Sequence, residues 1–291
     1  MLPAASPVPP LPPPALRAEL AGEQLVRTWT ITYRAHDGRL RHAYVVLPRW
    51  YGPHRDPRLP LVVSPHGRGV PARANARLWG NLPAIGRFAV VNPEGQGRVL
   101  ALYSWGDPGE ISDLARMPAI VQRALPWLRV ERRRVYAVGG SMGGQEVLLL
   151  VARYPHRFAG AAAFDAATNL AARYGAFRLL RYGRSVQQLA LQEVGGTPWA
   201  DPRAWALRSP LDCVRRIAFS HVPLQIWWST NDRVVVDQSR QSGMLFRRIV
   251  ELNPRARVQE FVGWWLHSAE FKASRRLPAA LALRGLLPPA L

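Results

Sequence analysis

A glycine-rich run, Gly139-Gly140-Ser141-Met142-Gly143-Gly144, joins a β-branched segment at 134–138 to a helix-forming segment at 145–150. A serine between glycines at such a junction is typical of a nucleophile elbow, a sharp turn that lifts the hydroxyl clear of the sheet. Glycine lets neighbouring chain pass close by. The free N–H groups of the following helix then face the place where an oxyanion would form. The alternative is a glycine-rich turn whose serine only caps the helix.

The rest of the chain alternates between strand-like and helix-like segments. Before them, Leu25–Tyr33 and Leu40–Leu47 flank a His-Asp-Gly turn and predict an antiparallel hairpin. Short apolar runs without alternation then predict strands buried on both faces, at 61–64, 88–91, 135–138, 158–163 and 224–228. Helices are expected between them, at 72–85, 113–128, 142–154 and 238–252. The pattern predicts an α/β fold with a mostly parallel, doubly wound sheet of about eight strands, whose connecting loops gather at one edge.

Length and composition predict one large domain with two additions. Residues 1–24 are rich in proline, and we expect a flexible leader there. Residues 25–291 form the α/β domain. Within it, the stretch at about 165–220 breaks the βα rhythm and is too long for an ordinary loop, so we interpret it as a small cap over the catalytic edge. A crossover helix with an irregular loop, or an oligomer contact, are the alternatives for this stretch.

The formal charge is +20, which would ordinarily suggest a nucleic-acid partner. Arginines are scattered through every segment and Lys272 is the only lysine, so compositional bias explains the charge better than a binding surface. We therefore predict no nucleic-acid partner. The run Arg132-Arg133-Arg134 is interpreted as a solvated loop just before a strand.

A single cysteine, Cys213, excludes an internal disulfide, and we interpret it as a packing residue. No apolar run reaches membrane-spanning length, so we expect a soluble protein without membrane insertion. The N-terminus lacks the basic region of a signal peptide, which favours the cytoplasm over secretion. The oligomeric state is left open.

A serine hydroxyl needs a histidine to take its proton, and that histidine needs an acid. Asp232 follows the predicted strand that ends at Trp228, so it lies on the same edge as Ser141. Asp237 is the competing acid, but it is farther from the strand end and is typical of a helix N-cap. His267 follows the last predicted strand, at 258–262, and completes the order Ser, Asp, His.

The segment Ser64-Pro65-His66-Gly67-Arg68-Gly69 follows a predicted strand and forms a glycine-rich turn. A backbone N–H of Gly67 or Arg68 can point at a developing oxyanion, and Met142 after the serine would supply the second donor. We expect the imidazole of His66 to brace this loop by hydrogen bonds.

Together, His66-Gly67, Gly139 to Gly144, Asp232 and His267 resemble the α/β-hydrolase superfamily. The chain is most similar to its prolyl-oligopeptidase-like branch and to feruloyl-esterase and polyhydroxybutyrate-depolymerase-like esterases, on the Ser-Met-Gly-Gly elbow and Ser209-Pro210-Leu211. The resemblance covers roughly 26–283. The oxyanion segment departs from the three-glycine form of lipases, and no propeller-sized domain precedes it.

The resemblance implies acyl transfer to water, with Ser141 attacking a carbonyl, His267 as base and then acid, and Asp232 orienting His267. We therefore predict a serine esterase that acts on a small-molecule ester. A pocket for the acyl or aryl group is expected among the residues His66, Trp105, Trp227 and Trp264. The alternatives are a serine peptidase for short peptides or acylated amino termini, and a non-catalytic binding protein on a hydrolase scaffold. We predict no cofactor and no metal, since no metal-ligand spacing is present.

Overall fold

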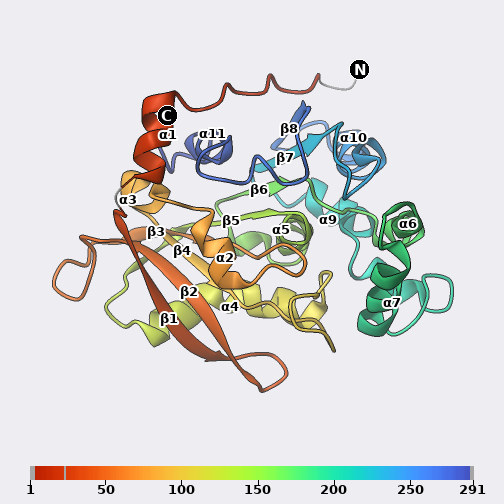
Figure 1. Cartoon of the computed structure of the whole chain (residues 1–291), viewed down its shortest axis with the longest axis horizontal. Helices are drawn as coiled ribbons and strands as arrows, with labels where there is room; N and C mark the ends of the chain where they lie inside the picture. The colour runs from red at the N-terminus through yellow and green to blue at the C-terminus, as the bar shows by residue number, and fades with distance from the viewer. Residues whose placement is uncertain (1–3, 23, 289–291) are drawn as a thin grey trace.

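The computed structural model describes residues 4–22 and 24–288. Eight strands form one sheet in the order β1-β2-β4-β3-β5-β6-β7-β8. The strands are β1 (Val26–Arg34), β2 (Leu40–Pro48), β3 (Leu59–Val63), β4 (Ala89–Pro93), β5 (Val130–Gly140), β6 (Gly160–Phe164), β7 (Leu224–Ser229) and β8 (Val258–Gly263). The predicted α/β fold with an antiparallel N-terminal hairpin is confirmed (Figure 1).

Strand pairing brings the loops after the parallel strands to one edge. β1 pairs with β2, and β2 with β4, in antiparallel register, whereas all later pairs from β4 to β8 are parallel. The strands β3, β4, β6 and β7 are buried along their whole length, which explains their continuous apolar sequence, and β5 is buried over its second half. Their carboxyl ends carry the segments that follow Val63, Gly140, Phe164 and Ser229.

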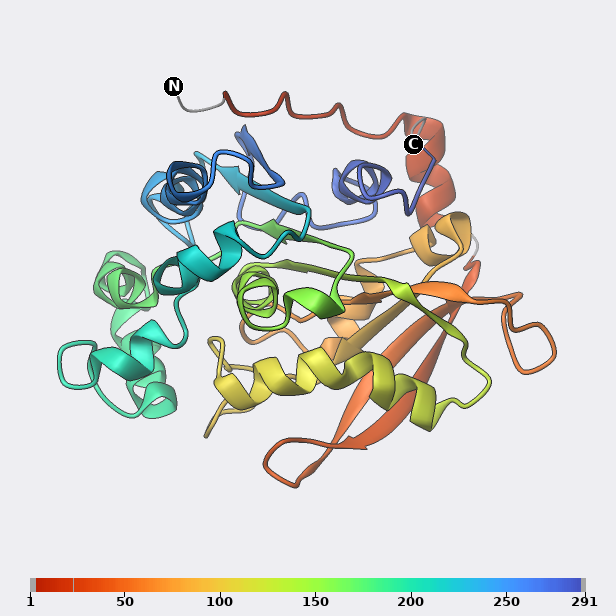
Figure 2. The same ribbon diagram turned by 180° about the vertical axis from the view of Figure 1, so that it is seen from behind.

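Helices cover both faces of the sheet (Figures 1 and 2). One face packs against α4 (Pro108–Ala124), α5 (Met142–Arg153), α9 (Val214–Ala218) and α10 (Ser242–Leu252). The other packs against α1 (Pro14–Ala21), α2 (Ala72–Arg77), α3 (Leu82–Gly86) and α11 (Leu277–Ala282). No helix in the described ranges has both the length and the apolar character needed to cross a membrane.

Several predicted boundaries were wrong, for local reasons. The expected helix at 72–85 is split into α2 and α3, because Gly80 between them takes a left-handed backbone. The helix expected from residue 113 begins earlier, because Asp107 caps α4. The helix expected from residue 238 begins at Ser242 after a 3-10 turn, and the side chain of Gln241 at the break accepts N–H groups from Thr168 and Asn169. The arginine run at 132–134 lies within β5, not in a loop.

The segment that we expect to be a flexible leader contacts the domain. Ser6 N–H donates to the Glu260 carbonyl at 2.8 Å, at the last strand of the sheet. Leu16 and Leu20 of α1 are buried in the core beneath α2 and α11. Its mobility stays a prediction.

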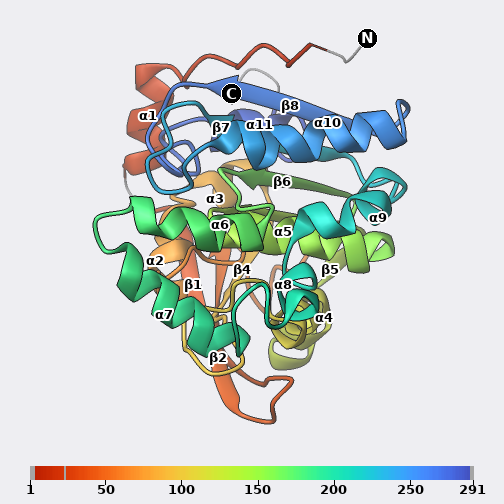
Figure 3. The ribbon, with the colours of Figure 1, turned by 90° about the vertical axis from the view of Figure 1, so that its right-hand side faces the viewer.

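The stretch at 165–220 carries three helices outside the two layers, α6 (Leu170–Ala176), α7 (Gly183–Val194) and α8 (Pro202–Ala206), seen together in Figure 3. They share a cluster with Met142 and Trp105. Glu193 on α7 is fully buried and accepts the backbone N–H groups of Arg98, Val99 and Leu100 at 2.5–2.9 Å. These bonds fix α7 to the loop after β4. Its role as a cap stays a prediction.

The core between β6, β7 and β8 contains a stack of aromatic rings. Trp227 has no exposed surface and lies between Phe164 and Phe261, with ring centroids 5.3 and 4.0 Å away. Its indole N–H donates to Gln225 Oε1 at 3.0 Å, so its polar atom is satisfied inside the core. Trp264, in contrast, is 77% exposed.

We therefore expect Trp227→Ala to lower the free energy of unfolding by about 3–5 kcal/mol, since it leaves a cavity and an unpaired Gln225 oxygen. The matched variant Trp264→Ala should change it by less than about 0.5 kcal/mol. Urea denaturation followed by circular dichroism measures both. Equal effects of the two substitutions would contradict this packing.

Candidate active site

Ser141 occupies a strained turn between β5 and α5. Its backbone has φ 58° and ψ −124°, a conformation that costs energy for any residue other than glycine. A Cβ on Gly139 would lie 2.7 Å from the backbone of Gly143, and one on Gly143 would lie 2.3 Å from the Pro65 carbonyl oxygen. Only glycine therefore allows β5, α5 and the loop after β3 to approach this closely. This packing presents the half-buried Ser141 at the sheet edge.

Three side chains from separate loops form a hydrogen-bonded line. His267 Nε2 lies 2.8 Å from Ser141 Oγ, and His267 Nδ1 lies 2.7 Å from Asp232 Oδ2. Asp232 comes from the loop after β7 and His267 from the loop after β8. The structure thus brings together the three residues that the sequence order singles out. The arrangement lets the imidazole accept a proton from Ser141 while its other nitrogen donates to a carboxylate.

Asp232 is held in its ionised form. Burial alone would raise its pKa, but the hydrogen bond and charge of His267, with donors from Gln238 and the Val234 N–H, lower it below the ordinary value. Asp237, the competing acid, is exposed and bonds to Ser239 and Arg240. It precedes the 3-10 turn at 238–240 without a side-chain capping bond.

A second carboxylate, Asp165 after β6, was missed in the sequence. It is fully buried, and Oδ2 accepts the Ser268 N–H at 2.8 Å and the Trp265 indole N–H at 3.0 Å, while Oδ1 accepts the Ser229 N–H at 3.0 Å. Asp165 therefore joins the end of β7 to the residues on both sides of His267. One feature of the sequence could have identified Asp165: it directly follows a buried strand, on the same sheet edge as Ser141.

The charge state of Asp165 depends on pH. Burial raises the pKa of its carboxyl to about 7, and the Asp232 charge acts in the same direction. The charge of His267 and the bonds from Trp265 and Ser268 act against this rise. Asp165, Asp232 and His267 offer ligand atoms within 4.8 Å of one another, a spacing that a metal ion could use. Most of these atoms already take part in the hydrogen bonds described above, so the arrangement fits proton transfer better than ligation.

The turn after β3 faces the start of α5. The backbone N–H groups of Gly67, Arg68 and Met142 donate to no other group in the part of the chain that the structure describes. A Cβ on Gly67 would lie 3.8 Å from Ser141 Cβ, so this turn is next to the serine. These free donors have the chemistry of an oxyanion site.

His66 is buried below this turn. Its Nδ1 lies 2.8 Å from the Gly67 carbonyl oxygen, and its Nε2 accepts the Gly95 N–H at 3.0 Å. Burial lowers the pKa of His66, which favours the neutral ring that this pattern requires. These two bonds match the expected bracing role. The buried ring of His66 does not line an open pocket, which corrects the expected assignment of His66 to the substrate pocket.

The predicted pocket tryptophans lie in different surroundings. Trp105 is next to the residue that follows the serine, because its backbone N–H donates to Met142 Sδ at 3.3 Å, but its ring is buried and packs near Phe177. Trp227 is inside the core and reaches no pocket surface, which corrects that assignment. Trp264 is largely exposed, and no described ring packs against it.

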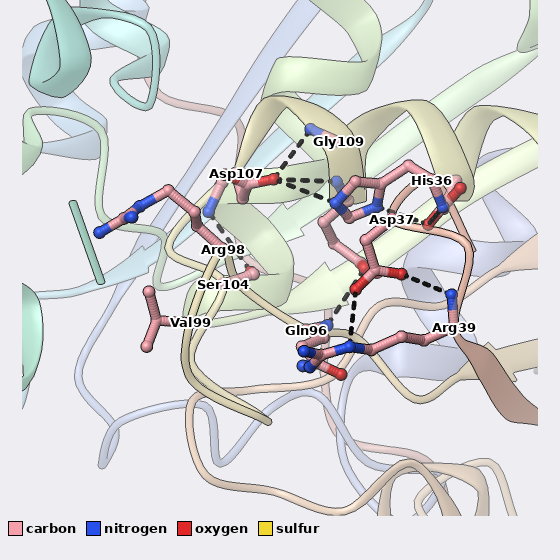
Figure 4. Close-up of polar contacts among 12 residues, drawn as sticks. His36, Asp37, Arg39, Gln96, Arg98, Val99, Ser104, Asp107 and Gly109 are labelled. Carbon is pink, nitrogen blue, oxygen red and sulfur yellow. Dashed lines mark hydrogen bonds and ion pairs between the residues drawn. The ribbon is translucent and has the colours of Figure 1, made fainter. Parts of the chain in front are cut away.

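A buried ionic network lies behind the elbow. Figure 4 shows Asp107 accepting the Gly109 N–H at the start of α4, with His36 and Asp37 from the β1–β2 turn close by. Asp107 also pairs with Arg208 at 2.9 Å. Glu146 on α5 is buried against Ser104, and burial raises its pKa to about 8. This network ties α4 and α5 to the segment at 165–220.

Comparisons with known proteins identify the family of the fold. The family model described as alpha/beta hydrolase fold matches residues 113–279, more than half of the chain. A search of curated proteins finds no match to the sequence.

Solved structures share the fold at low identity. An acylaminoacyl peptidase from Pyrococcus horikoshii is 14% identical with a TM-score of 0.67, over 90% of this chain and 41% of the peptidase. A Mycobacterium tuberculosis puromycin-hydrolyzing peptidase is 21% identical with a TM-score of 0.64, over 90% and 39%. An Agrobacterium tumefaciens S-formylglutathione hydrolase is 14% identical with a TM-score of 0.65, over 91% and 96%. This chain thus spans about two fifths of these peptidases but nearly the whole of the formylglutathione hydrolase.

We expect Gly143→Ala to lower the free energy of unfolding by about 1–3 kcal/mol, because its methyl group would overlap the Pro65 carbonyl. Gly175→Ala is the matched control, since a Cβ there meets nothing within 4 Å and alanine favours the α6 helix by about 0.5–1 kcal/mol. Thermal melts of both variants test this. A Gly143→Ala protein as stable as the wild type would contradict the close approach.

Because of Asp165, we expect the free energy of unfolding to fall as the pH rises. The pKa of its carboxyl is raised on folding. Its contribution to the free energy of unfolding is therefore greatest when the carboxyl is protonated, and it is lost as the pH rises through about 7. The stability of wild type relative to Asp165→Asn should therefore fall by about 3 kcal/mol between pH 5 and pH 8. Urea denaturation across this range measures the difference. A difference that stays constant or grows with pH would contradict the buried state of the carboxyl.

Proposed function

This chain belongs to the α/β-hydrolase family, and from that premise we propose that it is a serine hydrolase that cleaves carboxylic esters. The observation that carries the proposal is the line of hydrogen bonds from Ser141 through His267 to Asp232. Each residue comes from a different loop at the same sheet edge, and each has the chemistry its position needs.

The reaction follows from this geometry. As Ser141 Oγ attacks the substrate carbonyl, His267 Nε2 takes its proton, and Asp232 stabilises the imidazolium through Nδ1. His267 then gives the proton to the leaving alkoxide, which departs and leaves an acyl-enzyme on Ser141. Water then attacks this ester while His267 takes its proton. The second tetrahedral intermediate collapses, Ser141 Oγ regains the proton from His267, and the acid product leaves.

The oxyanion of each tetrahedral intermediate needs hydrogen-bond donors that stabilise its negative charge. We propose that the Met142 N–H and one N–H from Gly67 or Arg68 bind the oxyanion, because these groups lie beside Ser141 without other partners among the described residues. Loss of one such donor typically costs about 10²–10³ in kcat. The positive end of α5 adds a favourable field at the same place.

An ester substrate is favoured over a peptide with a free amino terminus. Such a peptidase needs an accessible carboxylate for the amine, and Glu94 and Glu110 both follow β4 in the sequence. Glu110 is fully buried, and burial together with the Glu146 charge raises its pKa well above the ordinary value. Glu94 is half-buried and accepts a bond from Tyr44. Glu110 therefore offers no accessible carboxylate to an amine, and the Glu94 carboxylate is already engaged by the Tyr44 hydroxyl.

We expect the purified protein to hydrolyse 4-nitrophenyl acetate or butyrate, and Ser141→Ala or His267→Ala to lower kcat by at least about 10³-fold. Asp232→Asn should lower kcat strongly while leaving the fold intact, because the wrong imidazole tautomer is then favoured. Initial rates of nitrophenolate release measure each variant.

Asp237→Asn is the matched control, since Asp237 is an exposed neighbour that makes no contact with His267. Rates with Ser141→Ala equal to wild type would exclude the proposal. Cleavage of an aminoacyl-nitroanilide in preference to the esters would identify a peptidase instead.

A further inference from the structure

Two arginines lie beside the proposed nucleophile without an acidic partner. Arg68 directly follows Gly67 in the turn next to Ser141. Arg173 on α6 donates through Nη2 to the Val234 carbonyl, in the loop that also carries Asp232. Arg173 packs over the Phe177 ring, which lies near Trp105, and Tyr103 joins Trp105 to the turn that carries Arg68. A chain of aromatic contacts thus links the two arginines beside the turn that adjoins Ser141.

Arg173 is a buried arginine that forms no ion pair with a carboxylate among the described residues. Its side chain is 3% exposed and packs over the Phe177 ring at 4.7 Å, while Nη1 has no hydrogen-bond partner among the described residues. Burial, with the charge of Arg68, lowers its pKa to about 10. The nearby charge of Asp232 opposes this shift, but both Asp232 oxygens are already engaged by His267, Gln238 and backbone N–H groups.

Two other buried arginines of this protein form ion pairs with carboxylates, whereas among the described residues Arg173 does not. Arg41 pairs with Asp37 and Glu110, and Arg208 pairs with Asp107 and Glu193. Both are as buried as Arg173. Within the described ranges, neither Arg173 nor Arg68 forms an ion pair with a carboxylate. An unpaired buried charge is costly, and its compensation is expected from a ligand.

The surroundings favour a small organic anion. Arg68 is half-buried, whereas Arg173 lies deeper and adds positive potential. Tyr103 lies over the same turn, since a Cβ on Gly69 would come within 3.2 Å of its hydroxyl, and its ring packs on Trp105. A guanidinium next to aromatic rings suits a carboxylate carried on a carbon chain.

We propose that Arg68 and Arg173 form an anion subsite, and that the substrate is an ester that carries a free carboxylate. This inference rests on the proposed ester hydrolysis at Ser141. It narrows the substrate to one whose carboxylate contacts Arg68 while its ester carbonyl reaches the serine. Arg173 supports that contact from below through its charge.

The experiment compares matched esters that differ only in charge. Mono-4-nitrophenyl adipate places a carboxylate on the acyl side, and 4-carboxyphenyl butyrate places it on the leaving-group side. The methyl ester of each carboxylate is its neutral partner. We expect wild-type kcat/KM to be at least about ten-fold higher for one anionic ester than for its neutral partner at low salt. Added NaCl should reduce this ratio.

Arg68→Gln and Arg173→Gln should each lower the ratio of anionic to neutral kcat/KM by at least about five-fold, and Arg173→Lys should retain most of it. Arg178→Gln is the matched control, because Arg178 is an exposed arginine of the same segment and should leave the ratio unchanged. Circular dichroism checks that each variant folds.

A wild-type enzyme that cleaves the neutral esters as well as both anionic ones would overturn the subsite and leave the proposed function intact. So would glutamine variants that keep the wild-type ratio. No hydrolysis of any ester would instead overturn the proposed function. If Arg173→Gln fails to fold, the wild-type preference and its salt dependence still decide the question.

Discussion

The close approach of Gly143 to the Pro65 carbonyl is the constraint on which the site depends. It sets the start of α5 against the turn after β3, so the free N–H groups of Met142 and the Gly67 turn lie on the same side of Ser141. Gly139 against Gly143 forces the same turn to be sharp and gives Ser141 its positive φ. The buried second half of β5 and the fully buried β6 hold this strained turn in place.

Buried charge is the second organising element, and the protein treats it in two ways. Behind the elbow, Asp107, Glu193 and Arg208 neutralise one another and fix the segment at 165–220 to the domain. In front of it, Asp165 holds the loop of His267, and Arg173 has no acidic partner. The charges behind the elbow are therefore paired with opposite charges, whereas Arg173 at the proposed site is not, within the described part of the chain.

The sequence was sufficient for the fold and for the three residues of the hydrogen-bonded line. Buried parallel strands have a recognisable apolar pattern, and Ser141 and Asp232 each follow such a strand, whereas His267 follows the half-buried edge strand β8. Asp165 also follows a strand, but its significance depends on donors from β7 and from the loop after β8, which lie far away in sequence. The break at Gln241 has the same origin, because its bonds reach residues 168 and 169. Trp227 and Trp264 both lie near strand ends, and only packing separates a core ring from an exposed one.

The central claim is that His267 activates Ser141 as a nucleophile. A fluorophosphonate probe tests it most directly, because such probes react with an activated serine and peptide mapping by mass spectrometry locates the adduct. We expect one adduct per chain, on Ser141, and a large loss of labelling in His267→Ala. Labelling of another residue, or equal labelling of Ser141 with and without the imidazole, would contradict it.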